Sequence, residues 1–341
     1  MTWEKSTTKN LGFDFTFLQS RLTFTADIFE RKVTDILIPG GKDYPALIGD
    51  DDLPFENAGI LKTTGFELQA KWSDKLANGF RYSVGVALSD DKAKVVSYPS
   101  NPTNKIGDGV LYKGYTVGDI WGYVTGGILQ EGDFDGVGAN GKPLYHGPYF
   151  KGGQAYPGYI WYQDLDHDGV ITTGLNTVDD PGDRKVIGNN APRYRYNITA
   201  NFQYKGFDLD LMFQGVGKRD YWLSSTSSYW GNGAGSWEVY NNSWTPERTD
   251  AKFPMYGSGT GSYPQTGYLL DASYIKLKQV ILGYTFPRAL INKIGLEKLR
   301  LNLAAYNLFT ISDMPKYYDA DYLSDAYPPK RTFSVGIQVG F

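Results

Sequence analysis

The sequence predicts an all-β fold, made of about nine antiparallel strands of a large transmembrane β-barrel with long extracellular loops. Three observations lead to this prediction. Apolar residues alternate with small or polar ones in many segments, these segments are long, and short and long connections alternate between them. The clearest segment is the last one, 331–341, where every second residue is apolar. A period of two places such side chains on one face of a β-strand.

The five apolar residues of this last segment form a C-terminal barrel signal. They are Phe333, Val335, Ile337, Val339 and Phe341. In a transmembrane barrel such a face meets lipid, and the final aromatic lies in the interfacial girdle. Strands of a soluble β-sandwich alternate as well, so this segment alone leaves both folds open.

The first four expected strands cover 3–18, 21–38, 59–72 and 80–88. Each shows alternation, as in Leu11, Phe13, Phe15 and Phe17 of the first strand. The turn between the first two is tight, at residues 19–20, and the turn before the fourth covers 73–79. These strands are about 10 to 18 residues long, which suits tilted membrane-spanning strands better than globular ones.

The remaining expected strands cover 194–204, 207–213, 272–286, 299–305 and 331–341. In the third of these the apolar phase slips near Gln279, which predicts a β-bulge. The segment 287–295 is expected to form a short helix, because Pro287 stands at its start.

The connections predict that all long loops lie at one end of the sheet. Short turns follow the first, third, fifth and seventh strands, whereas long segments follow the others: 39–57, 96–192, 217–270 and 311–330. Transmembrane barrels have this asymmetry, with short periplasmic turns and long outer loops. The longest segment, rich in Gly, Pro, Asp and Tyr, is expected to be irregular.

Polar side chains occupy the positions that alternate with the apolar ones, and we expect them to face inward. They include Glu67, Gln69, Lys71, Arg195, Asn197, Asn201, Asp208, Asp210, Lys298, Arg300 and Asn302. A small barrel fills its interior with packed side chains, whereas a wide barrel has a wet or plugged lumen. The polar inward positions therefore favour a wide barrel.

Composition excludes several classes of function. The chain has no cysteine, so it holds neither disulfides nor thiolate metal sites. A net charge of −3 gives no electrostatic reason to expect nucleic-acid binding. The first ten residues lack the apolar core of a signal peptide. If the protein acts outside the cytoplasm, we therefore expect that the chain lacks its own export signal and is the tail of a longer protein.

Several segments together resemble the carboxyl-terminal region of SusC/RagA-type TonB-linked outer-membrane transporters of Bacteroidetes. They occur in the order found in that family and span almost the whole chain: WEKSTTKNLGFDF, NAGILKTTGFELQ, YQDLDHDGVI, DRKVIGNNAPRYRYNITANFQYKGFDLDLMFQG, YIKLKQVILGYTFP, LRLNLAAYNLFT and YPPKRTFSVGIQVGF. We interpret residues 1–341 as the C-terminal part of the barrel of such a TonB-dependent receptor, without plug, TonB box or signal peptide.

The resemblance implies further features of the whole transporter. It implies a barrel of the 22-stranded type, a plug that contacts the TonB system, and a SusD-like surface lipoprotein above the barrel. It also implies uptake of oligosaccharides or peptides across the cell outer membrane, after insertion by the membrane assembly machinery.

An acidic segment after residue 163 predicts a structural calcium site. Asp164, Asp166 and Asp168 alternate before Gly169, as in the first half of a calcium-binding loop, and Val170 would offer its backbone carbonyl. Leu175 stands where an EF-hand has Glu, so a later carboxylate from Asp179, Asp180 or Asp183 would complete the shell, with Asp183 as the chosen candidate. The alternative is a solvated Asp-rich turn.

Aromatic residues in the loop 217–270 are candidates for contact with substrate or partner. They are Trp222, Tyr229, Trp230, Trp237 and Trp244. Aromatic rings surrounded by Gly, Ser and Asn suit adaptable recognition. The alternative is that they pack the loop or anchor it at the membrane interface.

The sequence predicts no enzyme activity. Its two histidines, His146 and His167, lack metal-ligand spacing, and no nucleophile elbow occurs. Two other functions stay open at this point: a soluble secreted β-sandwich that binds glycans through its tryptophans, and an enzyme that uses a carboxylate pair on polysaccharide.

Overall fold

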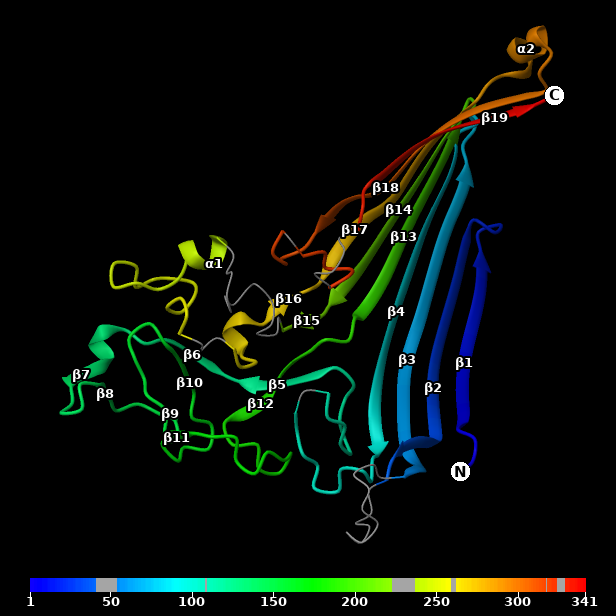
Figure 1. Cartoon of the computed structure of the whole chain (residues 1–341). Helices are drawn as coiled ribbons and strands as arrows, with labels where there is room; N and C mark the ends of the chain where they lie inside the picture. The colour runs from blue at the N-terminus through cyan, green and yellow to red at the C-terminus, as the bar shows by residue number, and fades with distance from the viewer. Residues whose placement is uncertain (41–53, 108, 223–236, 259–261, 317, 324–328) are drawn as a thin grey trace.

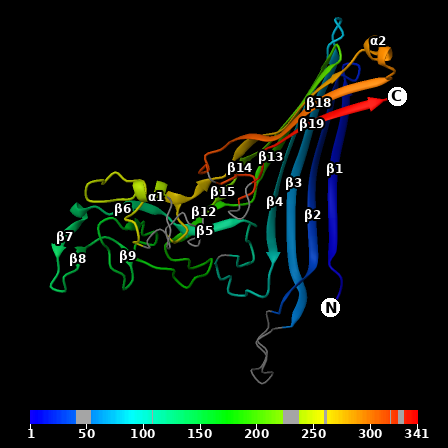
Figure 2. The same ribbon diagram turned by 45° about the horizontal axis from the view of Figure 1, so that its top comes forward.

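The computed structural model is dominated by one large, curved antiparallel sheet (Figures 1 and 2). The structure describes residues 1–40, 54–107, 109–222, 237–258, 262–316, 318–323 and 329–341. Nine strands form this sheet in the order β1-β2-β3-β4-β13-β14-β17-β18-β19. Each strand thus pairs with the next long strand of the chain, as in a barrel wall that runs up and down. The prediction of about nine antiparallel barrel strands is confirmed.

The strands lie close to the expected positions. Their bounds are β1 Lys5–Phe17, β2 Leu22–Pro39, β3 Phe55–Lys75, β4 Arg81–Ser97, β13 Arg193–Tyr204, β14 Phe207–Lys218, β17 Tyr274–Thr285, β18 Lys298–Ile311 and β19 Thr332–Gly340. The largest difference is in β4, which continues well beyond Leu88. Alternation ends there because charged residues follow, yet β4 stays hydrogen-bonded to β3, with Val95 opposite Leu61.

One face of the sheet is apolar across its whole width. A single row of paired residues crosses all nine strands and contains only apolar side chains: Phe17, Leu22, Trp72, Val84, Ala200, Leu211, Val280, Ala305 and Phe333. Alternation within one strand does not require that the residues paired with its apolar positions on the neighbouring strands are apolar too. A barrel surface that faces lipid does require this.

The bulge expected near Gln279 is present. The pairing of β17 with β18 shifts between Leu277 and Gln279, and the pairing of β14 with β17 shifts at the same place. The extra residue, Lys278, changes the phase of the strand. Leu277 and Val280 therefore both face the apolar side although one is odd-numbered and the other even-numbered.

Short turns lie at one end of the sheet and long connections at the other (Figure 1). The short-turn end carries α2 Arg288–Ile291 and η4 Asn292–Ile294, within the segment where a short helix was expected. It also carries the tight turn before β14, where Gly206 has a positive φ and a Cβ would lie 2.6 Å from the Thr285 carbonyl oxygen. Among the described residues, no helix is long and apolar enough to cross a membrane.

The expectation of an irregular segment 96–192 is wrong only in part, because several short strands interrupt it. Most of it folds, with 237–258 and 262–272, into a loop lobe beside the sheet (Figure 1). Strand β16 Leu270–Asp271 of the lobe pairs with β15 Asp220–Tyr221. The other elements of the lobe are β5 Asp119–Tyr123, β6 Thr125–Ile128, η2 Glu131–Asp133, β7 Phe134–Val137, β8 Pro143–Tyr145, β9 Tyr149–Phe150, β10 Ile160–Tyr162, β11 Val170–Ile171, β12 Arg184–Asn189, α1 Trp237–Asn241 and η3 Thr266–Tyr268. Their short strands carry too few residues for a visible period.

A hydrophobic core joins the two parts of the loop lobe. Its buried members are Tyr123, Ile160, Tyr162, Ile171, Val239, Phe253 and Tyr268. Burial raises the pKa of the Tyr149 hydroxyl beside this core to about 12. The Tyr162 hydroxyl accepts a hydrogen bond from Gln265 Nε2 at 3.0 Å. The described part of the lobe is thus a packed body with its own interior.

Candidate functional site

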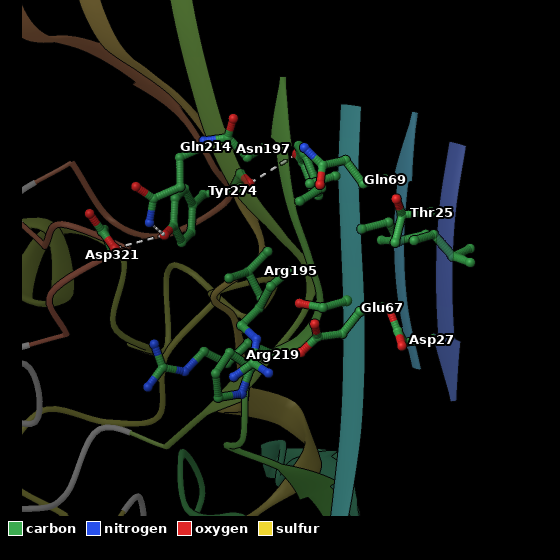
Figure 3. Close-up of a pocket in the computed structure, with 18 residues that line it drawn as sticks. Thr25, Asp27, Glu67, Gln69, Arg195, Asn197, Gln214, Arg219, Tyr274 and Asp321 are labelled. Carbon is green, nitrogen blue, oxygen red and sulfur yellow. Dashed lines mark hydrogen bonds between the residues drawn. The ribbon is translucent and has the colours of Figure 1, made fainter. Parts of the chain in front are cut away.

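A cavity of about 590 Å³ lies between the inner face of the sheet and the segment before β19 (Figure 3). Most of its polar lining comes from strands of the wall. The polar residues are Thr25, Asp27, Glu67, Gln69, Ser89, Arg195, Asn197, Gln214, Arg219, Tyr274 and Asp321. A cavity with several convergent polar groups is the usual form of a binding site.

Strand register places these side chains together. Asp27 pairs with Glu67, Glu67 with Ser89, and Ser89 with Arg195, so the four form one row across β2, β3, β4 and β13. Thr25, Gln69, Asn197 and Gln214 belong to the adjacent row on the same face. Residues two apart on a strand share a face, so both rows point into the cavity.

Sequence reasoning found part of this lining and missed part. Glu67, Gln69, Arg195 and Asn197 face inward as expected. Thr25 and Asp27 were missed, although they alternate with Phe24 and Ala26 and the same period predicts their direction. No local pattern marks Arg219, Tyr274 and Asp321 as lining residues. Contacts between distant parts of the chain bring them to the cavity.

The charged groups of the lining differ in their partners. Arg195 pairs with Asp91. Arg219 donates from Nε to the Asn190 carbonyl oxygen at 2.9 Å. Burial lowers the pKa of the Arg219 guanidinium, which still stays charged at neutral pH. Asp27 and Glu67, in contrast, have no ion-pair or hydrogen-bond partner for their carboxylates in the described part of the chain.

The segment before β19, described at 312–316 and 318–323, is held against the wall by a buried lysine. Lys276 is 1% exposed, and its Nζ lies 2.8 Å from Asp319 Oδ1 and 3.2 Å from Asp321 Oδ2. The Tyr274 hydroxyl donates to Asp321 Oδ1 at 2.7 Å. Apolar contacts around Met314 and Ala320 add to this attachment. The network fixes Asp321 at the cavity.

The same contacts control the charge of Asp321. Burial alone would raise the pKa of its carboxyl, but the hydrogen bond from Tyr274 and the charge of Lys276 outweigh burial and hold the pKa below its ordinary value. Asp321 is therefore ionised at neutral pH.

Three of the predicted metal ligands come together in the loop lobe. Carboxylate oxygens of Asp164, Asp166 and Asp183 lie within 4.8 Å of one another. Asp183 is fully buried and accepts hydrogen bonds from the backbone of Leu165 at 2.8 Å and Thr172 at 2.7 Å. Burial and these two hydrogen bonds fix the Asp183 carboxylate beside Asp164 and Asp166.

The other two predicted ligands lie beside this group. Asp168 accepts a hydrogen bond from the backbone of Val170 at 2.8 Å, and it is not one of the three clustered carboxylates. Val170 begins β11 and pairs with Tyr149 of β9. Burial, and then the neighbouring charges of Asp183, Asp168 and Asp164, raise the pKa of Asp166. The group thus carries closely spaced negative charge.

The predicted loop aromatics have different surroundings. Trp237 is 76% exposed and packs edge-on against Tyr240, with 5.7 Å between ring centroids. Trp244 is 3% exposed and donates from Nε1 to Gln130 Oε1 at 2.8 Å. Trp222 is partly buried against the core of the loop lobe. Tyr229 and Trp230 lie outside the described residues.

The C-terminal signal residues lie on β19, at one edge of the sheet. Phe333, Val335, Ile337, Val339 and Phe341 are all exposed. Leu303 of β18 pairs with Val335, and Leu301 pairs with Ile337, so their apolar face continues that of the neighbouring strand.

Comparison with known proteins shows that the chain is similar to TonB-dependent receptors. No family model matches it. It is 28% identical over 368 residues to TonB-dependent receptor P3 of Formosa agariphila, covering 100% of this chain and 34% of that protein. It is 26% identical over 363 residues to TonB-dependent receptor SusC of Bacteroides thetaiotaomicron, covering 100% of this chain and 32% of that protein.

A solved structure gives the same result for the fold. The RagAB peptide importer in its 'open-open' state aligns with a TM-score of 0.75 and 21% identity, over 100% of this chain and 35% of that one. The chain spans about a third of the length of the curated relatives it matches. The similarity to SusC/RagA-type TonB-dependent receptors indicated by the sequence motifs is therefore confirmed over the whole chain.

Proposed function

We propose that this chain forms wall and outer loops of a TonB-dependent importer in the cell outer membrane. The observation that carries the proposal is the apolar row across all nine strands, with polar rows on the opposite face of the same sheet. Such a sheet suits a barrel wall between lipid and an aqueous lumen. The names of the curated relatives, which are TonB-dependent receptors, support the same function.

In the proposed mechanism, substrate binds between the long loops and a SusD-like surface lipoprotein. The TonB system then pulls a plug, supplied by a part of the transporter outside residues 1–341, to open a path through the lumen. Residues of this chain line the path and hold the loops in position. Oligosaccharides and peptides are the substrate classes, and the name of the RagAB peptide importer supports peptides.

The two other functions fit the geometry less well. A soluble β-sandwich buries its strands between two packed sheets, whereas the outward residues Val84, Val86, Leu303 and Val335 of the large sheet are exposed. The relatives are named as receptors, which supports transport over hydrolysis.

Uptake by the full-length transporter that contains this chain tests the proposal. Cells that express it are given labelled peptides and oligosaccharides, with and without a working TonB system. We expect uptake of at least one class to stop when TonB is inactivated. Recovery of the transporter as a detergent-free soluble protein, or uptake that ignores TonB, contradicts the proposal.

We also propose that Asp164, Asp166 and Asp183 bind a structural calcium ion. The three carboxylates lie within 4.8 Å of one another and offer the oxygen ligands that calcium prefers. Asp164 and Asp166 belong to the turn at 164–169, whereas Asp183 lies later in the chain. A bound ion would therefore cross-link two parts of the loop lobe. Its expected role is to stabilise the lobe, without a part in chemistry.

Calcium removal is expected to make the loop lobe easier to unfold. At a calcium concentration about 100 times the Kd, binding would add about 2.7 kcal/mol to the stability of the lobe. Limited proteolysis of the full-length transporter with calcium and with chelator measures this difference. Asp166→Asn should abolish the protection by calcium, because Asp166 is one of the three clustered carboxylates and its hydrogen bond from the Asp168 backbone N, at 3.2 Å, is long. Asp135→Asn, at an exposed carboxylate paired with His146, is the control and should keep it. Equal cleavage with and without calcium contradicts a calcium site.

A further inference from the structure

We infer that the cavity on the inner face of the wall selects cationic peptides, with the positive group of the ligand held by Asp27 and Glu67. This inference rests on the proposed transport function and specifies its substrate class. Four observations carry it: the position of the two carboxylates, their lack of partners, the amide groups beside them and the guanidinium across the cavity.

Asp27 and Glu67 lie side by side on neighbouring strands. Asp27 of β2 pairs directly with Glu67 of β3, and both line the cavity (Figure 3). Directly opposed residues of antiparallel strands have Cβ atoms about 4.5–5.5 Å apart. The Asp27 carboxylate lies over Gly12 of β1, and both negative groups line the same cavity, where together they attract a cation more strongly than either does alone.

Neither carboxylate is neutralised by the chain itself. In the described residues, no basic side chain forms an ion pair with Asp27 or Glu67. The nearest guanidinium along the same row, that of Arg195, is paired with Asp91 of β4. Elsewhere on the inner face, carboxylates do have partners: Arg300 binds Asp208 through two nitrogens. Asp27 is partly buried and Glu67 is exposed, so both carboxylates are accessible to a ligand in the cavity.

The remaining lining suits a peptide backbone. Gln69 and Asn197 lie in the row next to the carboxylates, and each offers one amide donor pair and one acceptor. Arg219, from the other side of the cavity, uses only Nε for the Asn190 carbonyl. Its other guanidinium nitrogens can bind a peptide carbonyl or a terminal carboxylate.

A neutral oligosaccharide fits this lining poorly. Any ligand that fills the cavity removes water from Asp27 and Glu67. A sugar offers hydroxyl donors to the two carboxylates but no positive charge, so it gains less from them than a cation does. A lysine or arginine side chain, or an amino terminus, would pair with them directly.

Binding by the purified full-length transporter tests this inference. The probes are a fluorescent pentapeptide rich in lysine, one rich in glutamate, and a neutral hexasaccharide. We expect the lysine peptide to bind at least about tenfold more tightly than the other two. The double variant Asp27→Asn, Glu67→Gln keeps the shape of both side chains and removes their charge, and we expect it to abolish this preference. Added salt should weaken binding of the lysine peptide to the unmodified protein.

Asp210→Asn is the matched control. Asp210 is another inward carboxylate, hydrogen-bonded to Asn201, and it does not line the cavity. This variant should keep the preference for the lysine peptide. If the hexasaccharide binds as tightly as the lysine peptide, or if the double variant binds the lysine peptide unchanged, the inference is overturned. The second result is also the one expected if a basic segment of the plug occupies the cavity.

The same variants in cells separate this inference from the proposed function. If the transport proposal is right and the inferred selectivity is wrong, uptake stays TonB-dependent and the double variant imports the lysine peptide normally. If the transport proposal itself fails, uptake does not depend on TonB, whereas the purified protein still prefers the lysine peptide.

Discussion

Replacing Lys276 by methionine is expected to release the segment 312–323 from the barrel wall. Lys276 is 1% exposed and is shared by Asp319 and Asp321. Without the ammonium, Asp319 loses its ion-pair partner, and Asp321 keeps only the more exposed Lys278 among its described ion-pair partners. Breaking a buried ion pair from one side destabilises by about 3–5 kcal/mol. Limited proteolysis of the full-length transporter should show rapid cleavage between 312 and 323 in the variant.

Lys278→Met is the matched control for this prediction. Lys278 also reaches Asp321, at 3.2 Å, but its side chain is 37% exposed. Exposed ion pairs contribute only about 0–1 kcal/mol, so cleavage should change little. Equal resistance of the Lys276 variant and the unmodified protein would show that apolar contacts alone hold the segment.

Acid should weaken the same attachment. The pKa of Asp321 is held below its ordinary value in the folded protein. The stabilisation from its charge is therefore complete above the ordinary carboxyl pKa and is lost as the pH falls through the lower, folded value. Proteolysis with an acid-active protease across this range measures the loss, which should be absent in Asp321→Asn.

Replacing Val86 by arginine is expected to destabilise the barrel in its membrane by about 2–4 kcal/mol. Val86 is 43% exposed and lies on the apolar face of β4, between β3 and β13 in the middle of the described wall. If this face meets the centre of the bilayer, the guanidinium is forced into hydrocarbon. Denaturant unfolding of the full-length transporter, inserted in lipid vesicles, measures the change.

Ser83→Arg gives the matched control on the same strand. Ser83 pairs with Asn201 on the inner face, beside polar groups. An arginine there should be tolerated, with a change of about 0.5 kcal/mol or less, because water and polar side chains surround it. A larger loss at Ser83 than at Val86 would mean that the two faces of the wall have been assigned the wrong way round.

The wall could be predicted from sequence because its signal is local. Alternation along each strand marks the face of every residue, and even the bulge near Gln279 appears as a change of phase. The end of β4 has no alternation, because its last part, 89–97, carries charged residues on both faces. Hydrogen bonding to β3 keeps it a strand there, and that contact has no local signature.

The loop lobe and most of the cavity could not be predicted, because their contacts join distant parts of the chain. Tyr123 and Phe253 share one core although 130 positions separate them. Lys276 meets Asp319 across 43 positions. The Asp-rich turn at 164–169 was visible, and one of three proposed later carboxylates, Asp183, closes the group. The loop tryptophans had no signal that separates the buried Trp244 from the exposed Trp237.

Solvent and lipid accessibility along β19 tests the central claim of a membrane-spanning wall most directly. This chain contains no cysteine, so single cysteines at 332–340 can carry spin labels without further changes to it. With the full-length transporter in lipid bilayers, collisions with oxygen report lipid and collisions with a water-soluble nickel complex report the lumen. We predict oxygen maxima at 333, 335, 337 and 339, and nickel maxima at 334, 336 and 338. A profile in which the odd positions are shielded from both reagents, as in the core of a soluble sandwich, would contradict the account.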